Sequence, residues 1–342
     1  MRKYNVAVVG ATGAVGEEML DVLAEVNFPI ANLVPLASAN SAGKTIQFQG
    51  EEFQVQELTE NSFEENEIEI ALFSAGGSIS AKYAPFAVEA GAVVIDNTSH
   101  FRMESDIPLV VPEVNPEDIE KWRNRGIIAN PNCSTIQMVQ VLKPLDRRYS
   151  IQRVDVSTYQ ATSGAGKKAM EELAQQMKDF FSFKLDESPH NAFPHQIALN
   201  VIPQIDRFME SDFTKEEEKM VYETQKILHK NIEVASTCVR VPVLRGHSES
   251  VTITFEKDID VDEVREILEN SPNIVVVDKP SESLYPMPIV ANGKNETFVG
   301  RIRKDLYRNN ILHLWIVADN LRVGAATNAV RIAQKWIELD NE

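Results

Sequence analysis

The sequence predicts an α/β protein of two domains, in which a parallel sheet covered by helices precedes an α+β domain with a largely antiparallel sheet. Its length of 342 residues corresponds to about two domains. In residues 1–130, short and continuously apolar runs alternate with helical patterns, which is typical of a parallel sheet buried on both faces. From residue 151 onward the strand-like runs lengthen, and several alternate apolar with polar residues. This pattern favours an antiparallel sheet with one wetter face.

The individual elements follow from the same periodicity. In the first domain we expect strands at 4–9, 33–37, 68–73, 92–95, 109–112 and 126–129, and a helix at 15–23 after the first strand. In the second we expect strands at 152–159, 235–243, 249–255, 273–277, 297–303 and 311–317, with helices at 166–181, 214–229 and 261–270. The predicted boundaries are 1–130 and 131–323, and the closing helix, 324–342, is expected to fold back onto the first domain.

Composition excludes several classes of protein. The chain has 34 Lys and Arg against 51 Asp and Glu, a net charge of −17, which disfavours a nucleic-acid surface built on cationic side chains. Two cysteines, Cys133 and Cys238, do not indicate a disulfide framework, and we expect no bound metal. Neither a secretory leader nor an apolar run long enough for a membrane span is apparent, so we expect a cytoplasmic protein without a membrane partner.

A glycine-rich turn follows the first expected strand. Gly10, Gly13 and Gly16 lie in GATGAVG, directly before the first helix. Their GxxGxxG spacing differs from GxGxxG, but glycines at this position allow a tight turn and close approach of a pyrophosphate to the helix N-terminus. The pattern predicts a Rossmann-type dinucleotide site; an ordinary strand-to-helix turn is the alternative.

The end of the second strand indicates which dinucleotide binds. Segment 35–44, PLASANSAGK, has no acidic residue to bond a ribose 2′-hydroxyl. It offers Ser38, Ser41 and Lys44 instead, which suit a 2′-phosphate. We therefore predict NADP rather than NAD, with a solvated turn that contacts no cofactor as the alternative.

Cys133 is the candidate nucleophile. It lies in ANPNCSTIQ, where Asn-Pro-Asn disfavours helix and the residues after Cys133 have helical periodicity. A helix N-terminus favours thiolate over thiol, and nearby backbone N–H groups can hold an oxyanion. The alternative is a small buried cysteine packed in a core, which describes Cys238 in the strand-like STCVRVPV better.

A thiol nucleophile needs an acid–base partner, and His247 is the candidate among six histidines. It follows a glycine just after a strand that carries Arg240. A histidine and a carboxylate-binding arginine on one strand–turn unit suit proton transfer and substrate binding. From the residues alone, a structural role for His247 is equally compatible.

Seven segments together resemble the bacterial form of aspartate-semialdehyde dehydrogenase. They are GATGAVG, FRMESD, NPNCSTIQ, YQATSGAG, EEEK, RVPVLRGHS and DNLRVGAATNAV, and they occur in order along essentially the whole chain. The resemblance implies NADP- and phosphate-dependent interconversion of aspartate-4-semialdehyde with 4-phospho-L-aspartate, in the biosynthesis of lysine, diaminopimelate, methionine, threonine and isoleucine. It also implies a cofactor domain, then a catalytic and dimerisation domain, in a homodimer or a tetramer of such dimers.

The resemblance also assigns roles to the residues that carry the chemistry. Cys133 is implied as the nucleophile and His247 as general base and acid. Gln160 is implied to orient the intermediate or the substrate amino group. Arg240 is implied to pair with the substrate α-carboxylate, a bidentate match that lysine does not reproduce. The further substrate and phosphate residues implied are Arg102, Asn132, Glu216 and Lys219, where Glu217 or Glu218 could replace Glu216 within the run of three glutamates.

On the cofactor side, the resemblance implies contacts from two sets of residues. Around the pyrophosphate and adenosine these are Gly10, Ala11, Thr12, Gly13, Ala14, Gly16, Ser38, Ala39 and Ser41, and around the nicotinamide they are Ser163, Gly164 and Asn320. The sequence departs from the family pattern at two positions: Asn40 stands where an arginine is frequent, which weakens the inference of NADP, and Asn320 stands where glutamine is frequent.

Two other readings remain. Related acyl-phosphate reductases, such as N-acetylglutamyl-phosphate reductase or glyceraldehyde-phosphate dehydrogenase, also use a cysteine at a helix start and a remote histidine. They are not expected to combine RVPVLRGHS with EEEK. A catalytically silent homologue is expected to have lost Cys133, His247, Gln160 or Arg240, and this chain retains all four.

Overall fold

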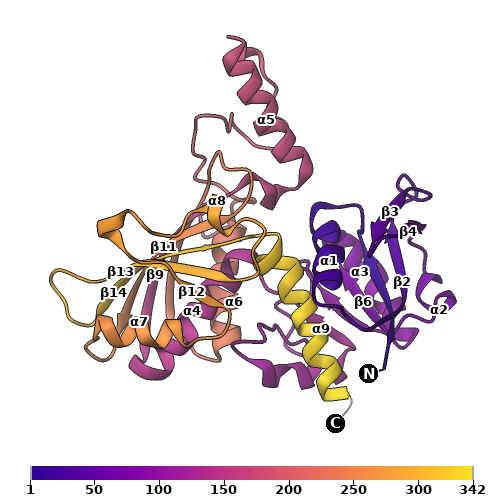
Figure 1. Cartoon of the computed structure of the whole chain (residues 1–342), viewed down its shortest axis with the longest axis horizontal. Coiled ribbons are helices and arrows are strands. Elements are labelled where there is room, and N and C mark those ends of the chain that lie inside the picture. Colours follow the sequence, from indigo (N-terminus) through magenta and orange to yellow (C-terminus); the bar gives the residue numbers. More distant parts are fainter. Residues whose placement is uncertain (1, 341–342) are drawn as a thin grey trace. The chain divides into compact units, whose positions relative to one another are not determined.

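The computed structural model describes residues 2–340 and separates into two compact units. The first contains the chain up to Asn132 together with the chain from Ala325 onward, and the second is Cys133–Gly324. Figure 1 traces both along the sequence. Each has its own six-stranded sheet, parallel in the first unit and mostly antiparallel in the second, as predicted.

The first unit is built around a sheet with the strand order β5-β2-β1-β6-β7-β8. All its neighbouring strands run parallel, and β1 lies at the centre with four consecutive buried residues. The strands are β1 (Tyr4–Val9), β2 (Ile30–Ala37), β5 (Gln56–Glu57), β6 (Ile70–Phe73), β7 (Val93–Asp96) and β8 (Ile127–Ala129), with a separate hairpin of β3 (Thr45–Phe48) and β4 (Glu51–Gln54). The helices are α1 (Ala14–Glu25), α2 (Ser62–Glu65), α3 (Gly77–Glu89), the 3-10 segment η1 (Pro116–Asn124) and α9 (Thr327–Asp340).

The closing helix α9 packs inside this unit. Trp336 makes edge-on ring contacts with Tyr4 and with Trp122, at centroid distances of 6.2 and 5.6 Å. Its apolar side shares one buried cluster with α1 and the central strands. One expected strand, 109–112, is absent; Leu109 makes a single bridge to Ala129 instead, because the following residues turn toward η1.

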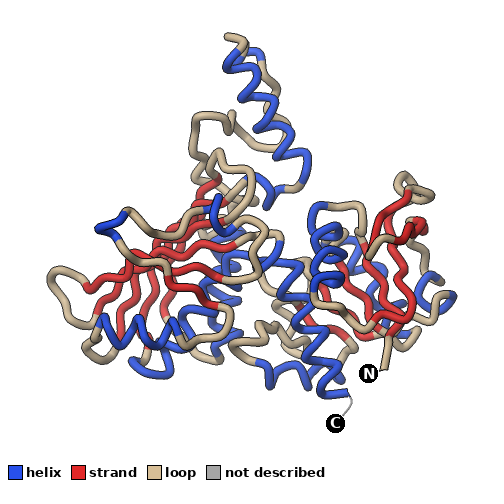
Figure 2. The backbone as a smooth tube through the Cα atoms, viewed as in Figure 1, coloured by secondary structure: helices blue, strands red, loops and turns tan. Residues whose placement is uncertain are grey.

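The second unit has the strand order β10-β9-β11-β14-β13-β12. Figure 2 shows these strands side by side. They are β9 (Ile151–Gln160), β10 (Glu233–Arg240), β11 (His247–Phe255), β12 (Ile274–Val276), β13 (Thr297–Lys304) and β14 (Ile311–Ala318). The helices are α4 (Cys133–Tyr149), α5 (Lys167–Phe181), α6 (Lys215–Leu228), α7 (Val261–Glu269) and α8 (Pro288–Ala291), with short segments η2 (Thr162–Ala165), η3 (Leu185–Glu187), η4 (Pro280–Glu282) and η5 (Arg322–Ala326).

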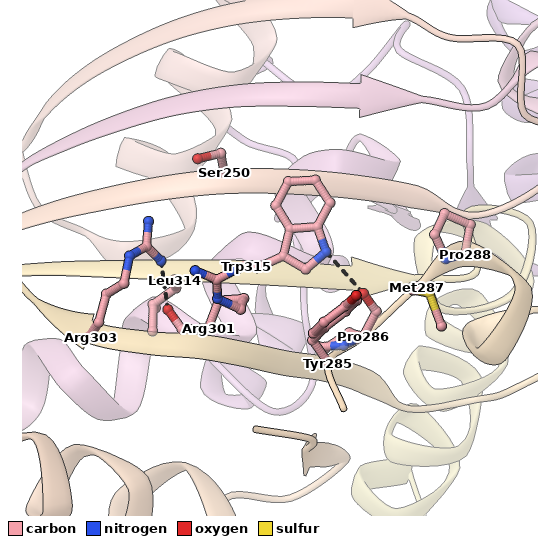
Figure 3. A pocket seen from close by; sticks show the side chains of 9 residues that line it. All are labelled: Ser250, Tyr285, Pro286, Met287, Pro288, Arg301, Arg303, Leu314 and Trp315. Carbon is pink, nitrogen blue, oxygen red and sulfur yellow. Dashed lines mark hydrogen bonds between the residues drawn. The ribbon is translucent and has the colours of Figure 1, made fainter. Parts of the chain in front are cut away.

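The two faces of this second sheet differ. Helices α4, α6 and α7 pack against one face. The other carries a pocket of about 340 Å³ lined by Tyr285, Met287 and Trp315 among others, and the Trp315 indole donates a 3.0 Å hydrogen bond to the Pro286 carbonyl (Figure 3). Tyr285 and Met287 are partly exposed there. This is the wetter face that the alternating strands predicted.

Candidate active site

The predicted catalytic side chains gather at one edge of the second sheet. Strands β9 and β10 run parallel and end together at Gln160 and Arg240, which are register partners. Strand β11 runs antiparallel to β9 and therefore begins, at His247, where β9 ends. Helix α4 is followed at once by β9, so its first residue, Cys133, lies toward the same edge. Gln160, Arg240 and His247, which are far apart in sequence, thus lie at the sheet edge near the start of α4.

Cys133 is partly exposed and opens α4. At this position the helix dipole favours a thiolate. Gly324 lies close against it: a Cβ added to Gly324 would lie only 2.5 Å from the Cys133 Cβ. Cys238, in contrast, is fully buried on β10, and burial raises the pKa of its thiol far above the ordinary value. The two cysteines therefore differ as expected for one reactive and one packing residue.

His247 is fully buried, and its orientation is set by the backbone. Its Nδ1 accepts a 3.0 Å hydrogen bond from the Ala161 N–H, which requires the neutral tautomer with its proton on Nε2. Burial, together with the positive charge of Arg240, lowers the pKa of His247 to about 3. The ring therefore presents an Nε2–H donor. A general base needs an unprotonated Nε2, so this geometry supports the donor half of the predicted role.

Arg240 is held beside this histidine. Its Nη1 donates a 2.7 Å hydrogen bond to the Ala161 carbonyl, while Nε is buried without a hydrogen-bond partner among residues 2–340. Burial lowers the pKa of the guanidinium, and negative charge on Glu216 and Cys133 opposes that shift. A buried guanidinium with an unused donor is suited to a planar carboxylate.

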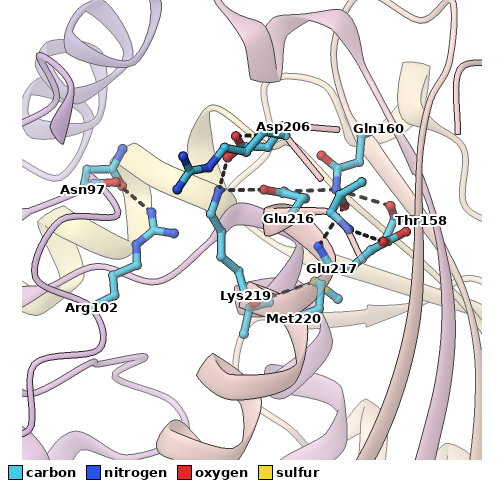
Figure 4. Close-up of polar contacts among 12 residues, drawn as sticks. Asn97, Arg102, Thr158, Gln160, Asp206, Glu216, Glu217, Lys219 and Met220 are labelled. Carbon is cyan, nitrogen blue, oxygen red and sulfur yellow. Dashed lines mark hydrogen bonds and ion pairs between the residues drawn. The ribbon is translucent and has the colours of Figure 1, made fainter. Parts of the chain in front are cut away.

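Glu216 connects the glutamine to the predicted phosphate lysine. Its Oε1 accepts a 3.2 Å hydrogen bond from Gln160 Nε2, and its Oε2 accepts one of 3.0 Å from Lys219 Nζ (Figure 4). Lys219 also contacts Asp206 at 3.1 Å. These contacts favour Glu216 over Glu217 as the glutamate that faces the substrate. Glu217 is engaged elsewhere, because it completes the capping box of α6 with Thr214.

The other predicted substrate residues belong to the first unit. Arg102 is buried in the loop after β7, where its Nη2 donates a 2.9 Å hydrogen bond to the Asn97 carbonyl. Asn132 is buried at the end of this unit, directly before Cys133. A shared phosphate site of Arg102 with Lys219 stays a prediction.

Two of the predicted cofactor residues near the catalytic edge, Ser163 and Asn320, are joined by a hydrogen bond. Ser163 Oγ donates to Asn320 Oδ1 at 2.9 Å, and the Gly246 N–H donates to the same oxygen at 2.9 Å. A Cβ on Gly164 would lie 2.9 Å from Arg240 Nη1 and 3.2 Å from His247 Nε2. A side chain at position 164 would therefore crowd both Arg240 and His247.

In the first unit, the glycine-rich turn forms part of a pocket of about 600 Å³. Gly10, Thr12, Gly13, Ser38 and Ala39 line it with Ala37, Glu57, Leu58, Ser74, Ala75, Ile79 and Tyr83. Ala11 is buried within the turn, and Ala14 begins α1. Ser41 lies 3.4 Å from the Thr12 hydroxyl and 3.4 Å from Lys44 Nζ.

The backbone of this turn fits a dinucleotide cradle. Gly10 has a φ of +88°, and a Cβ on Gly16 would lie only 2.1 Å from the Gly10 carbonyl oxygen. The close packing of turn and helix therefore requires glycine, as it does where a backbone approaches a pyrophosphate. Sequence reasoning missed Glu57, which lines the pocket because β5 pairs with the end of β2.

Comparisons with known proteins cover nearly the whole chain. The family model for the semialdehyde dehydrogenase NAD binding domain matches residues 5–122, and that for the dimerisation domain matches residues 142–323. Aspartate-semialdehyde dehydrogenases from Campylobacter jejuni subsp. jejuni and Aquifex aeolicus are 65% and 56% identical to this chain. The alignments cover 100% of this chain and 99% of the first relative, and 98% of each for the second.

Solved structures give the same result. The crystal structure of Vibrio cholerae aspartate semialdehyde dehydrogenase II complexed with ASA superposes with a TM-score of 0.95 at 50% identity, over 99% of both chains. The Candida albicans enzyme with NADP superposes with a TM-score of 0.73 at 25% identity, over 97% of this chain and 98% of that one. Within residues 2–340, no helix is long and apolar enough to cross a membrane.

Proposed function

The chain belongs to the aspartate-semialdehyde dehydrogenase family, and from this premise we propose its reaction in detail: the NADP-dependent, reversible reductive dephosphorylation of 4-phospho-L-aspartate to L-aspartate-4-semialdehyde and phosphate. The reaction passes through an acyl-thioester on Cys133. The observation that carries the proposal is the meeting of Cys133, His247, Gln160 and Arg240 at one sheet edge. Such an enzyme serves cytoplasmic amino-acid biosynthesis.

Substrate recognition uses the charged groups at that edge. Arg240 is suited to the α-carboxylate because its buried Nε–H is a hydrogen-bond donor without an acceptor among residues 2–340. Glu216 is suited to the substrate ammonium, and Gln160, which already contacts Glu216, orients the reacting carbon. Lys219 and Arg102 are each proposed to bind phosphate. Binding of anionic substrates in a chain whose net charge is −17 requires such cations.

In the oxidising direction, the Cys133 thiolate adds to the aldehyde carbon and the carbonyl oxygen becomes an oxyanion. His247 Nε2–H donates to this oxygen, and the first backbone N–H groups of α4 lie beside it. The oxyanion then collapses to the thioester carbonyl as the same carbon loses a hydride, for which bound NADP would supply the acceptor. Phosphate then attacks the thioester carbon, the C–S bond breaks, and the acyl-phosphate leaves as the thiolate returns.

For the cofactor, the glycine cradle and pocket in the first unit support a nicotinamide dinucleotide. Ser38, Ser41 and Lys44 favour NADP, whereas Glu57 is the group that would disfavour a 2′-phosphate. The ratio of kcat/KM for NADP and NAD tests this proposal, and Glu57→Gln is expected to raise the preference for NADP. A clear preference of the wild type for NAD would contradict it.

We also propose that two chains pair through the partly exposed face of the second sheet. The support is the match to a dimerisation domain and the apolar pocket around Tyr285, Met287 and Trp315. Sedimentation equilibrium separates this homodimer from a tetramer and from a monomer. Trp315→Glu, which places a charge on this face, is expected to weaken the dimer.

The decisive experiment measures NADPH formation from aspartate semialdehyde with and without phosphate. We expect activity only with phosphate, and a loss of at least ~10³-fold in Cys133→Ala because covalent catalysis is removed. Cys238→Ala is the matched control and should retain activity. Activity with N-acetylglutamate semialdehyde or glyceraldehyde-3-phosphate instead would favour the related reductases, and phosphate-dependent activity in Cys133→Ala would refute the mechanism.

A further inference from the structure

A buried carboxyl group lies directly behind the catalytic edge. Glu249 follows His247 by two residues on β11, and both are fully buried. Successive side chains of a strand point to opposite faces, so residues two apart share a face. Glu249 therefore points to the helix-covered side of the sheet, one step further from the site than His247.

Gln137 occupies the equivalent place on α4. It follows Cys133 by four residues, which puts both on one side of the helix, and it is fully buried. Helix α4 runs antiparallel to β9, which follows it after the single residue Ser150, and β9 runs antiparallel to β11. Thus α4 and β11 run in the same direction.

The advance along the two elements is nearly equal. Four helical residues rise about 6 Å and two strand residues about 6.6 Å. The pair Gln137 and Glu249 therefore repeats the pair Cys133 and His247 at the next level of the same two elements.

The side-chain polar atoms of Gln137 and Glu249 lack hydrogen-bond partners in the part of the chain that the structure describes. Among residues 2–340, neither carboxyl oxygen of Glu249 nor either amide atom of Gln137 has a hydrogen bond of ordinary geometry. Burial raises the pKa of Glu249 well above its usual range, and the Gln137 side chain, which faces it, opposes this only in part. The titratable group that interacts with Glu249 from β10 is the Cys238 thiol. A thiol is itself an acid, so it does not stabilise a charged Glu249.

An apolar side chain would fill this space without the cost of burying a carboxyl group. We propose that Glu249, as a neutral acid facing Gln137, is a positioning residue that sets the register of α4 on β11 and so holds Cys133 against His247. A neutral carboxyl can donate to the Gln137 carbonyl and accept from its amide, a pairing that favours one register. The inference rests on the proposed function, because it concerns the geometry of that reaction.

The test compares Glu249→Gln, Glu249→Met and Glu249→Asp in the full-length enzyme. Glu249→Gln keeps the shape and neutral polarity of the acid, so its kcat should stay within about threefold of wild type. Glu249→Met and Glu249→Asp should lower kcat by ~10–100-fold, since a displacement of about 1 Å at the reacting atoms costs up to ~100-fold in rate. The KM for NADP should not change.

The matched control is Val251→Ala, which creates a cavity at a buried residue of β11. Val251 lies two residues after Glu249, on the same face of the strand. It should lower the unfolding temperature without a comparable loss of kcat. A second readout is the rate of Cys133 alkylation by iodoacetamide across pH, which should change in Glu249→Met and not in Val251→Ala; Cys238 is too buried to interfere.

Two results would overturn the inference: Glu249→Met and Glu249→Asp with kcat close to that of wild type, or Val251→Ala with an equal loss. If Glu249→Met does not fold, the difference between Glu249→Gln and Glu249→Asp decides alone. Failure of the proposed function is distinct, because the wild type would then lack phosphate-dependent activity or Cys133→Ala would keep it.

Discussion

Gly324→Ala should disable the enzyme while leaving the fold in place. Gly324 lies in η5, and an added Cβ would lie 2.5 Å from Cys133 Cβ, 3.0 Å from its Cα and 3.4 Å from its carbonyl oxygen. Carbon atoms in contact are ordinarily about 3.5–4.0 Å apart. The nearest pair is thus about 1 Å too close. The three atoms met are two backbone atoms and the Cβ of Cys133, so a rotamer change of Cys133 moves none of them.

This steric overlap of about 1 Å determines the expected effects on stability and on rate. Overpacking costs ~1–3 kcal/mol of unfolding free energy, which a protein of this size can tolerate. The same displacement at a nucleophile costs ~100-fold in rate, because the near-attack geometry is lost. We therefore expect a large fall in kcat for NADPH formation with only a modest fall in unfolding temperature.

Gly77→Ala is the control for this measurement. Gly77 opens α3 in the first unit, and a Cβ there would meet only the His100 Cβ, at 3.8 Å. This variant should match the wild type in both assays. A kcat for Gly324→Ala within about threefold of wild type would refute the reasoning, since the clash would then be relieved without moving Cys133.

Three further predictions concern α6, Arg240 and His247. Thr214→Ala removes the cap shared with Glu217 and should lower the free energy of unfolding by ~1 kcal/mol in urea titrations; no change would show that the cap is redundant. Arg240→Lys should raise KM for aspartate semialdehyde ~10–100-fold, because lysine cannot bond the Ala161 carbonyl and a carboxylate with one planar group; an unchanged KM would place the carboxylate elsewhere. His247 has a folded-state pKa of about 3, below its ordinary 6.5, so the folded protein binds fewer protons between these values. The contribution of His247 to the free energy of unfolding is complete above pH 6.5. It decreases as the pH is lowered from 6.5 toward 3, by up to ~1.4 kcal/mol per pH unit. His247→Gln should therefore make the free energy of unfolding less dependent on pH in this range, as measured by denaturation curves.

Much of the fold could be predicted because its signals are local. Apolar runs and their spacing predicted the parallel and antiparallel sheets, and both are confirmed. The strand expected at 109–112 was wrong: Leu109 makes one bridge to the edge strand β8 and the chain then turns toward η1, which an apolar run does not reveal. Segment lengths likewise shifted at element ends, where capping decides the boundary; α6, for example, begins after its cap at Thr214.

The residues of the candidate site that could be predicted from the sequence are also those that depend on local signals. Glycines in the turn at Gly10 and a helix start at Cys133 are visible in sequence, because both depend on residues adjacent in the chain. The member of the glutamate run that faces Gln160 was not visible, since three neighbouring positions on a helix differ only in direction. Tertiary packing directs Glu216 to it. Glu57 became a pocket residue only through the pairing of β5 with β2.

The sequence by itself determined the two-domain α/β class, the cofactor turn and the pair of candidate residues Cys133 and His247. Only the tertiary structure decided how these groups act. The tautomer of His247 depends on the Ala161 N–H, a contact across 86 positions of sequence. The neutral state inferred for Glu249 depends on complete burial opposite Gln137. Protonation and direction are set by what surrounds a side chain in space, and spacing along the chain carries no record of that.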